Sequence, residues 1–324
     1  MIARLFVQLV LASTLFQFFP ADVGELERRA ASDAPERRTF DVLSSGRTLS
    51  RLPASADRAL SPTKIVTASM GVVTSAESAI VMDRRSREVL YEKNIQVPRA
   101  IGSITKLMTA YVFLQGRPDV NAPATITAAD VRLGAALHVS VGETVTVKNL
   151  LEASLVGSDN TATMAIARLS GLSLGDFVAR MNEEAAFMGM QETTFADPTG
   201  LSSDNVSVVT DLARMFDVVL ENETIRDITQ RSSVTMTGSS GRTYTIESTD
   251  ELLTSFVNQA PYKIVGGKTG FLPEAGYTLG SIFSREGEGD VIVVVLGSES
   301  KEGRFQDVKS LAVWAYQTFT WSSL

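Results

Sequence analysis

The sequence predicts an α+β protein in which an antiparallel β-sheet is flanked by helices and joined to a mainly helical lobe. In the middle of the chain, apolar residues recur at spacings of three and four, which is typical of amphipathic helices. Beyond about Gln230 the apolar period changes to two, which is typical of strands. These strands are joined by short turns, so we expect them to pair antiparallel.

The first predicted element is a β-hairpin. Residues 79–83 and 88–91 are strand-like runs, and the polar residues 84–87 between them form its turn. A helix is then predicted over residues 101–114, where Gly102 permits a tight bend into the helix. Short helices are predicted to build the lobe over residues 147–156, 161–169, 174–188 and 211–220.

The last third of the chain is predicted to supply most of the sheet. A hairpin is expected over residues 234–246, because a glycine-containing turn separates two alternating runs. A helix over residues 305–319 carries an apolar stripe that would cover the sheet. Between them, strands are predicted over residues 262–269, 276–283 and 290–296.

The composition bounds what the protein can do. Its 324 residues are 44% hydrophobic and 21% charged, which suits a globular protein with a sizeable core. A net charge of −7 without any basic run argues against a nucleic-acid partner. There is no cysteine, which excludes disulfides and thiolate catalysis, and the single histidine, His138, lacks the companions that a zinc site needs. We therefore expect no metal site and interpret His138 as a surface or packing residue.

The N-terminal residues indicate export. Residues 1–20 combine one positive charge, Arg4, with an apolar run that is short for a membrane span and suits a secretory signal peptide or signal anchor. Residues 21–68 are rich in Arg, Glu, Ser and Ala without periodicity, which predicts a flexible linker. Residues 69–324 then form the folded domain. An uncleaved N-terminus would tether that domain to a membrane.

Ser103 and Lys106 form the first candidate for chemistry. Ser103 falls at the start of the predicted helix, where unpaired backbone N–H groups and the helix dipole favour an oxygen that gains negative charge. Lys106 lies three residues later and shares a helix face with it. A desolvated lysine amine could take the proton of the Ser103 hydroxyl.

Sequence context selects this pair, because Ser-x-x-Lys occurs three times in the chain. The pair that begins at Ser61 contains a proline and has no apolar helical repeat behind it. The pair that begins at Ser298 follows a strand-like run in a charged turn. Only Ser103 is followed by a sustained apolar helix.

Two further clusters complete the candidate site. Ser158-Asp159-Asn160 lies in a tight connection between two predicted helices, where a hydroxyl and an amide can be held rigidly. A second Ser-Asp-Asn, at residues 203–205, is interpreted as a turn, since Asn and Asp favour turns. Lys268-Thr269-Gly270 occurs once, at the predicted end of a strand, and could offer a cation, a hydroxyl and backbone N–H groups to an anionic peptide end.

The ordered set Ser-x-x-Lys, Ser-x-Asn and Lys-Thr-Gly resembles that of penicillin-binding proteins and serine β-lactamases. From about residue 78 to residue 319 the chain is similar to the low-molecular-weight penicillin-binding proteins, the D-alanyl-D-alanine carboxypeptidases and endopeptidases of peptidase family S11. Supporting stretches include residues 195–201 and 274–277. The resemblance implies a β-lactamase/transpeptidase-like fold, with the active site between the sheet and the helical lobe, and no cofactor.

The resemblance also implies roles for individual residues. Ser103 would attack the carbonyl of a D-Ala-D-Ala or cross-link bond to form an acyl-enzyme, with Lys106 as general base. Ser158 and Lys268 would relay a proton to the leaving amine. The backbone N–H groups of Ser103 and Phe271 would form the oxyanion hole, while Thr269 and Arg304 would hold the terminal carboxylate. The implied substrate-binding residues are Asn160, Lys268, Thr269, Gly270, Phe271 and Arg304.

The implied partners are peptidoglycan stem peptides ending in D-Ala-D-Ala, with β-lactams as covalent inhibitors, and the implied location is the periplasm or cell envelope. The catalytic domain is expected to lack the C-terminal β-rich domain of many relatives, a short architecture that also resembles the endopeptidase branch. Whether the bond cut is terminal or in a cross-link therefore stays open.

Three other functions are weighed. A class A β-lactamase needs a deacylating glutamate in a Glu-x-x-x-Asn pattern, which the region around Glu192 lacks. A non-catalytic penicillin sensor is disfavoured by the intact Ser103, Lys106 and Lys268. An α/β-hydrolase is disfavoured because no histidine follows the Gly-x-Ser-x-Gly at residues 171–175, where we expect Ser173 to cap a helix.

Overall fold

The computed structural model describes residues 61–132, 134 and 137–322. The predicted signal segment lies outside the described residues, as does the predicted linker up to residue 60. The end of that linker contains β1 (Thr63–Lys64), which pairs with β13 (Phe319–Thr320). Within the described ranges, no helix is both long enough and apolar enough to cross a membrane.

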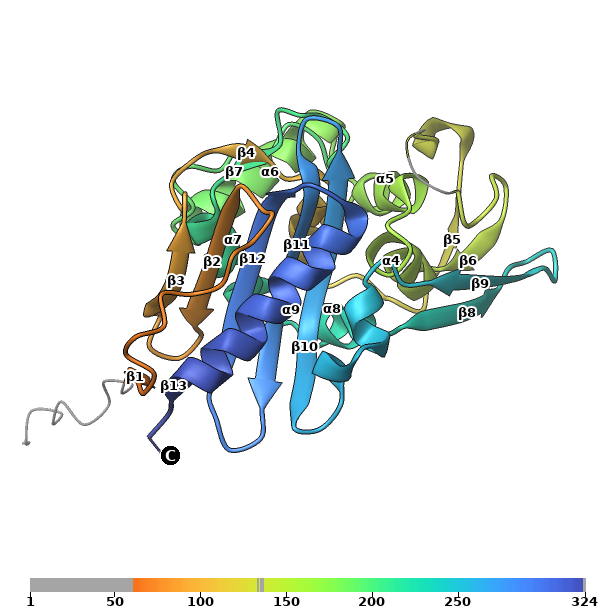
Figure 1. Cartoon of the computed structure of the whole chain (residues 1–324). Helices are drawn as coiled ribbons and strands as arrows, with labels where there is room; N and C mark the ends of the chain where they lie inside the picture. Colours follow the sequence, from red (N-terminus) through yellow and green to blue (C-terminus); the bar gives the residue numbers. More distant parts are fainter. Residues whose placement is uncertain (1–60, 133, 135–136, 323–324) are drawn as a thin grey trace, which may run out of the picture. The chain divides into compact units, whose positions relative to one another are not determined.

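A five-stranded antiparallel sheet forms the framework for the rest of the fold (Figure 1). The strand order is β10–β11–β12–β2–β3, so the hairpin near the start of the described chain pairs with strands from its end. The antiparallel prediction is confirmed. The strands are β2 (Ser78–Asp83), β3 (Val89–Lys93), β10 (Tyr262–Leu272), β11 (Gly276–Arg285) and β12 (Val291–Ser298).

Both faces of this sheet are covered. α9 (Lys301–Thr318) packs on one face, as Figure 1 shows, and α7 (Val209–Val219) packs on the other. Successive residues of β12 alternate between the two cores, because side chains of a strand point to opposite faces. Val291, Val293 and Val295 pack with α9, whereas Ile292, Val294 and Leu296 join the core of the helical lobe.

The predicted stripe of the closing helix is confirmed, with Val308, Leu311 and Ala315 fully buried against the sheet. The helix begins four residues earlier than predicted, at Lys301. Ser300 caps it by accepting a hydrogen bond from the Gly303 N–H. The apolar pattern missed this first turn because its residues are polar or glycine.

In the part of the chain that the structure describes, five helices build the lobe beside the sheet, and four of them lie where helices were predicted. The exception is α8, a seven-residue helix that periodicity cannot detect. The sequence feature that could have indicated its start is Asn222, which caps the helix by accepting a hydrogen bond from the Ile225 N–H. The helices are α3 (Thr105–Gln115), α4 (Val147–Leu155), α5 (Asn160–Leu169), α6 (Leu174–Phe187) and α8 (Glu223–Thr229).

Short two-stranded sheets lie outside the five-stranded sheet. The predicted hairpin is confirmed as β8 (Ser233–Thr237) and β9 (Thr243–Glu247), and the ladder β5 (Pro123–Thr125) with β6 (Thr144–Thr146) was not predicted. A further ladder pairs β4 (Arg99–Ala100) with β7 (Val206–Ser207), which brings the chain just before Ser103 beside the turn at residues 203–205.

Candidate active site

Ser103 lies in a 3-10 turn, η2 (Gly102–Ile104), that leads directly into α3. The predicted helix start at residue 101 is therefore replaced by this tighter turn. Gly102 adopts a φ of +55°, which supports the predicted bend. Ser103 is half-buried, with its hydroxyl close to α3.

Lys106 is fully buried and its amine makes three hydrogen bonds. Its Nζ donates to Ser103 Oγ at 2.8 Å, to Asn160 Oδ1 at 2.7 Å and to the Thr199 carbonyl at 2.6 Å. The amine and hydroxyl predicted to share a helix face are thus in direct contact. The structure also brings Asn160, from the start of α5, into the same cluster.

Burial lowers the pKa of Lys106 to about 7, because removing the ammonium from water penalises its charged form. The carboxylates of Asp197 and Asp159 act in the opposite direction and raise the pKa. A substantial fraction of this amine is therefore neutral near pH 7, and a neutral amine can accept a proton.

The Thr199 carbonyl belongs to a loop that the sequence did not assign a role. The Asp197 carboxylate organises this loop by accepting hydrogen bonds from the backbone N–H groups of Thr199, Gly200 and Ser202. Asn205 donates to the same carboxylate, and its N–H donates to the Ser202 carbonyl, so the turn predicted at residues 203–205 is confirmed. The Asp-Pro-Thr-Gly string at residues 197–200 was the sequence feature that could have identified this loop.

Gly200 shows why this loop needs a glycine. Its φ is +83°, and a Cβ there would lie 2.0 Å from the Gly102 carbonyl oxygen. No side chain fits that approach. The backbone of the loop is therefore packed directly against the turn that carries Ser103.

Ser158 occupies the tight connection between α4 and α5, as predicted. Its φ of +59° is left-handed, which costs a non-glycine residue about 1–3 kcal/mol and often marks functional sites. The neighbouring Asp159 holds the connection by accepting from Thr161 N and Ala162 N at the start of α5. It also accepts from His138 N.

Lys268 approaches Ser158 from the sheet. Its Nζ donates to Ser158 Oγ and to the Thr269 carbonyl, each at 3.0 Å. Burial lowers its pKa well below the usual range, and the nearby charges of Lys106 and Arg304 lower it further. The predicted strand end at Thr269 is wrong, because β10 continues to Leu272 in pairing with β11.

Glycines let β10 pass against the Ser103 turn. A Cβ on Gly270 would lie 2.7 Å from the Ile101 carbonyl oxygen and 3.1 Å from Ser103 N. Conversely, a Cβ on Gly102 would lie 3.0 Å from Phe271 N. The backbone amides of Ser103 and Phe271 thus border the same close approach.

The remaining predicted residues lie on the last part of β10 or reach it from α9. The Thr269 hydroxyl is buried and lies 2.6 Å from the Thr249 hydroxyl. Arg304 reaches from α9 and donates from Nη1 to the Gly270 carbonyl at 3.0 Å. Phe271 is 48% exposed and stacks on Tyr277 at a centroid distance of 4.5 Å.

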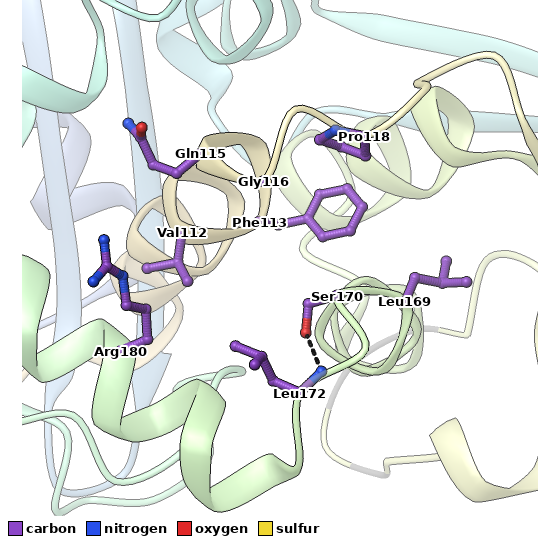
Figure 2. A pocket seen from close by; sticks show the side chains of 9 residues that line it. All are labelled: Val112, Phe113, Gln115, Gly116, Pro118, Leu169, Ser170, Leu172 and Arg180. Carbon is purple, nitrogen blue, oxygen red and sulfur yellow. Dashed lines mark hydrogen bonds between the residues drawn. The ribbon is translucent and has the colours of Figure 1, made fainter.

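A cavity of about 500 Å³ lies elsewhere, between the end of α3, the end of α5 and α6 (Figure 2). Its walls are mostly apolar, with Phe113, Leu169 and Leu172 among them, and Arg180 at one side. None of the predicted site residues lines it. The predicted site residues instead gather at the junction of α3, the α4–α5 connection and β10.

Comparison with known proteins agrees with this arrangement. The D-alanyl-D-alanine endopeptidase of Haemophilus influenzae is 34% identical over 206 residues, which cover 63% of this chain and 69% of that protein. The D-alanyl-D-alanine carboxypeptidase DacF of Bacillus subtilis is 27% identical over 250 residues, covering 75% and 63%. The crystal structure of the Streptomyces K15 DD-transpeptidase superposes with a TM-score of 0.71 at 28% identity, covering 77% of this chain and 100% of that one.

The fold neighbour confirms the transpeptidase-like α+β architecture expected from the motifs. Residues 64–300 match the family described as D-alanyl-D-alanine carboxypeptidase, Peptidase_S11. That match includes the three motif segments but ends just before Arg304. The chain accordingly belongs to peptidase family S11, a family of serine peptidases.

Proposed function

We propose that the protein is a serine-type D-Ala-D-Ala carboxypeptidase that acts on peptidoglycan stem peptides through an acyl-enzyme. The observation that carries this proposal is the 2.8 Å contact between Lys106 Nζ and Ser103 Oγ, made by a buried lysine whose pKa is about 7. A nucleophile and a partly neutral base in direct contact are what acyl transfer requires.

In the acylation step, the Ser103 hydroxyl gives its proton to Lys106 and its oxygen bonds to the substrate carbonyl carbon. The carbonyl oxygen becomes an oxyanion, which the N–H groups of Ser103 and Phe271 stabilise. Asn160 positions the acyl part of the peptide and, through its Oδ1, also holds the Lys106 amine.

Collapse of the intermediate breaks the C–N bond, and the leaving D-Ala nitrogen needs a proton. Ser158 and Lys268, whose Nζ lies 3.0 Å from Ser158 Oγ, relay to it the proton that Lys106 took from Ser103, so that Lys106 is neutral again. Water then attacks the acyl carbonyl and gives a proton to Lys106, which returns one to Ser103 Oγ as the ester bond breaks and the shortened peptide leaves.

The terminal carboxylate of the substrate is bound at Thr269, next to Gly270. Arg304 contributes positive charge there while its Nη1 is held by the Gly270 carbonyl. β-Lactams, which are cyclic amides bearing a carboxylate, would acylate Ser103 by the same route. These substrates imply an exported, cell-envelope protein, with the N-terminal apolar run as its export signal or tether.

A second candidate is a DD-endopeptidase that cuts peptidoglycan cross-links. The Haemophilus influenzae relative, at 34% identity, carries that name. The same Ser103 chemistry serves both reactions, which differ only in the group attached to the leaving nitrogen.

Mass spectrometry of muropeptides after incubation with the purified protein tests both candidates. Loss of a single alanine from pentapeptides supports the carboxypeptidase, whereas conversion of cross-linked dimers into monomers supports the endopeptidase. The Ser103→Ala variant is the matched control. If the wild-type protein changes neither substrate, the proposed function is wrong.

A further inference from the structure

The segment 248–251, which joins β9 to η4 (Glu251–Thr254) and includes the first residue of η4, contacts three separate elements that carry candidate site residues. The Thr249 N–H donates to the Val156 carbonyl at 3.1 Å, two residues before Ser158. The Thr249 hydroxyl lies 2.6 Å from that of Thr269. Glu251 forms an ion pair with Lys301, in the first turn of the helix that carries Arg304.

We propose that Thr249 is a positioning residue that orients the Thr269 hydroxyl toward the terminal carboxylate of the peptide substrate. The inference rests on the proposed function and concerns a residue outside the three motifs. It follows from the directions in which the two hydroxyls can donate.

A carboxylate only accepts hydrogen bonds, so Thr269 must use its own hydrogen to bind it. The Thr269 oxygen is then the acceptor in its bond with Thr249, and Thr249 is the donor. Among the described residues, Thr249 is the single hydrogen-bond partner of the Thr269 hydroxyl. Its donation therefore selects the rotamer in which the Thr269 hydrogen points away from Thr249.

The backbone keeps Thr249 in place for this task. Its N–H is tied to Val156, and the next residue, Asp250, caps η4 by accepting from the Leu252 N–H. Thr249 itself is half-buried, whereas Thr269 is buried. A fixed donor beside a buried hydroxyl lowers the entropy lost when that hydroxyl binds substrate.

Removal of only the hydroxyl tests the proposal. Thr249→Val keeps the shape of the side chain, and Thr249→Ser keeps the donor. Each variant is assayed on a peptide ending in D-Ala-D-Ala with a free carboxylate and on the same peptide with a C-terminal amide. We expect the Val variant to lose roughly three- to tenfold in kcat/KM on the free acid, in line with one hydrogen bond. The loss on the amide should be smaller, because the amide NH₂ can donate to the Thr269 oxygen instead.

The Ser variant should restore the activity on the free acid. Thr254→Val is the matched control, since Thr254 is exposed and its hydroxyl donates to the Glu251 carbonyl within the same turn. It should leave the cleavage of both peptides unchanged. Thermal melts accompany each assay. Equal losses of the Val variant on acid and amide would identify a structural role and overturn the proposal, as would a Val variant indistinguishable from wild type.

The role of Thr249 and the proposed function can fail separately. If the wild-type protein cleaves the acid and the Val variant does so equally well, only the role of Thr249 is wrong. If the wild-type protein cleaves neither peptide, the proposed function fails and the role of Thr249 fails with it.

Discussion

Lys106 and Lys268 enter the candidate active site from different layers, one from α3 in the helical lobe and the other from β10 in the sheet. Both are almost completely buried, and each donates to a serine hydroxyl. The charged groups around them differ, since carboxylates prevail around Lys106, whereas Lys268 has two cations and the Asp250 carboxyl nearby. The carboxylates of Asp197 and Asp159 raise the pKa of Lys106 and so oppose the effect of its burial. The charges of Lys106 and Arg304 instead lower the pKa of Lys268 further.

In the proposed mechanism, this difference separates the roles of two residues of the same type. The carboxylates keep the pKa of Lys106 at about 7, where an amine can take a proton and later return it. Lys268 lies in a more positive environment, which suits its proposed position beside an anionic substrate.

The largest expected effect comes from removing the base. Lys106→Ala should lower the rate of acylation by a fluorescent penicillin about 10²- to 10⁴-fold, because the Ser103 proton then has no acceptor. Circular dichroism should show a folded protein. Lys64→Ala, at the remote β1 strand, is the control and should acylate normally. Near-normal labelling of the Lys106 variant would refute its role.

The pH dependence of the wild-type protein tests the same residue without a mutation. The base acts in its neutral form, so the acylation rate should rise with pH through the Lys106 pKa of about 7. From pH 5 to pH 8 the neutral fraction grows roughly a hundredfold for such a pKa. Labelling rates measured at constant ionic strength should follow this rise. A flat profile would contradict it.

The loop that holds Lys106 through the Thr199 carbonyl packs its backbone against Gly102, and Gly200→Ala should disrupt this contact. A new Cβ would collide with the Gly102 carbonyl oxygen, in addition to the strain of a positive φ. Gly171→Ala is the matched control, since its φ of +79° is similar and a Cβ added there would meet no atom within 4 Å. The control should lose about 1–2 kcal/mol. The Gly200 variant should lose more and label more slowly. Equal melts and rates would rule out a role for the contact.

The smallest expected effect is a change in stability on mutation of Asp250, a buried carboxyl near Lys268. Burial raises the pKa of this carboxyl to about 6, although the Leu252 N–H, Arg304 and Lys268 favour its charged form, and Glu251 adds to the rise. A raised folded-state pKa means that the ionised form destabilises the fold above about pH 6, while the penalty is absent below the unfolded value near 4.

Asp250→Asn, which can still cap η4, should therefore melt higher than wild type at pH 7 but not at pH 4. The comparison requires thermal melts of both proteins at the two pH values. A variant that is less stable at pH 7 would show that the charged form of Asp250 is favoured by its surroundings.

The site motifs could be predicted because they lie on local elements with recognisable patterns. Helical context separated Ser103 from the other two Ser-x-x-Lys serines. In the structure Ser61 is exposed, and Ser298 donates to Asp307. Ser173 caps α6, as its spacing indicated.

Other parts of the site depend on contacts between segments far apart in the chain, which no local pattern encodes. The Thr199 carbonyl that holds Lys106 and the Thr249 hydroxyl that meets Thr269 are of this kind. The end of β10 was misplaced for a related reason. Glycine usually weakens strands, but Gly270 is required here because the Ser103 turn lies against it.

Covalent labelling tests the identity of the nucleophile most directly. The purified wild-type protein, Ser103→Ala and Ser61→Ala are each incubated with a fluorescent penicillin, denatured and separated on a gel. Our account predicts that wild type and Ser61→Ala carry the label and that Ser103→Ala does not. A labelled Ser103→Ala protein beside an unlabelled Ser61→Ala protein would contradict it.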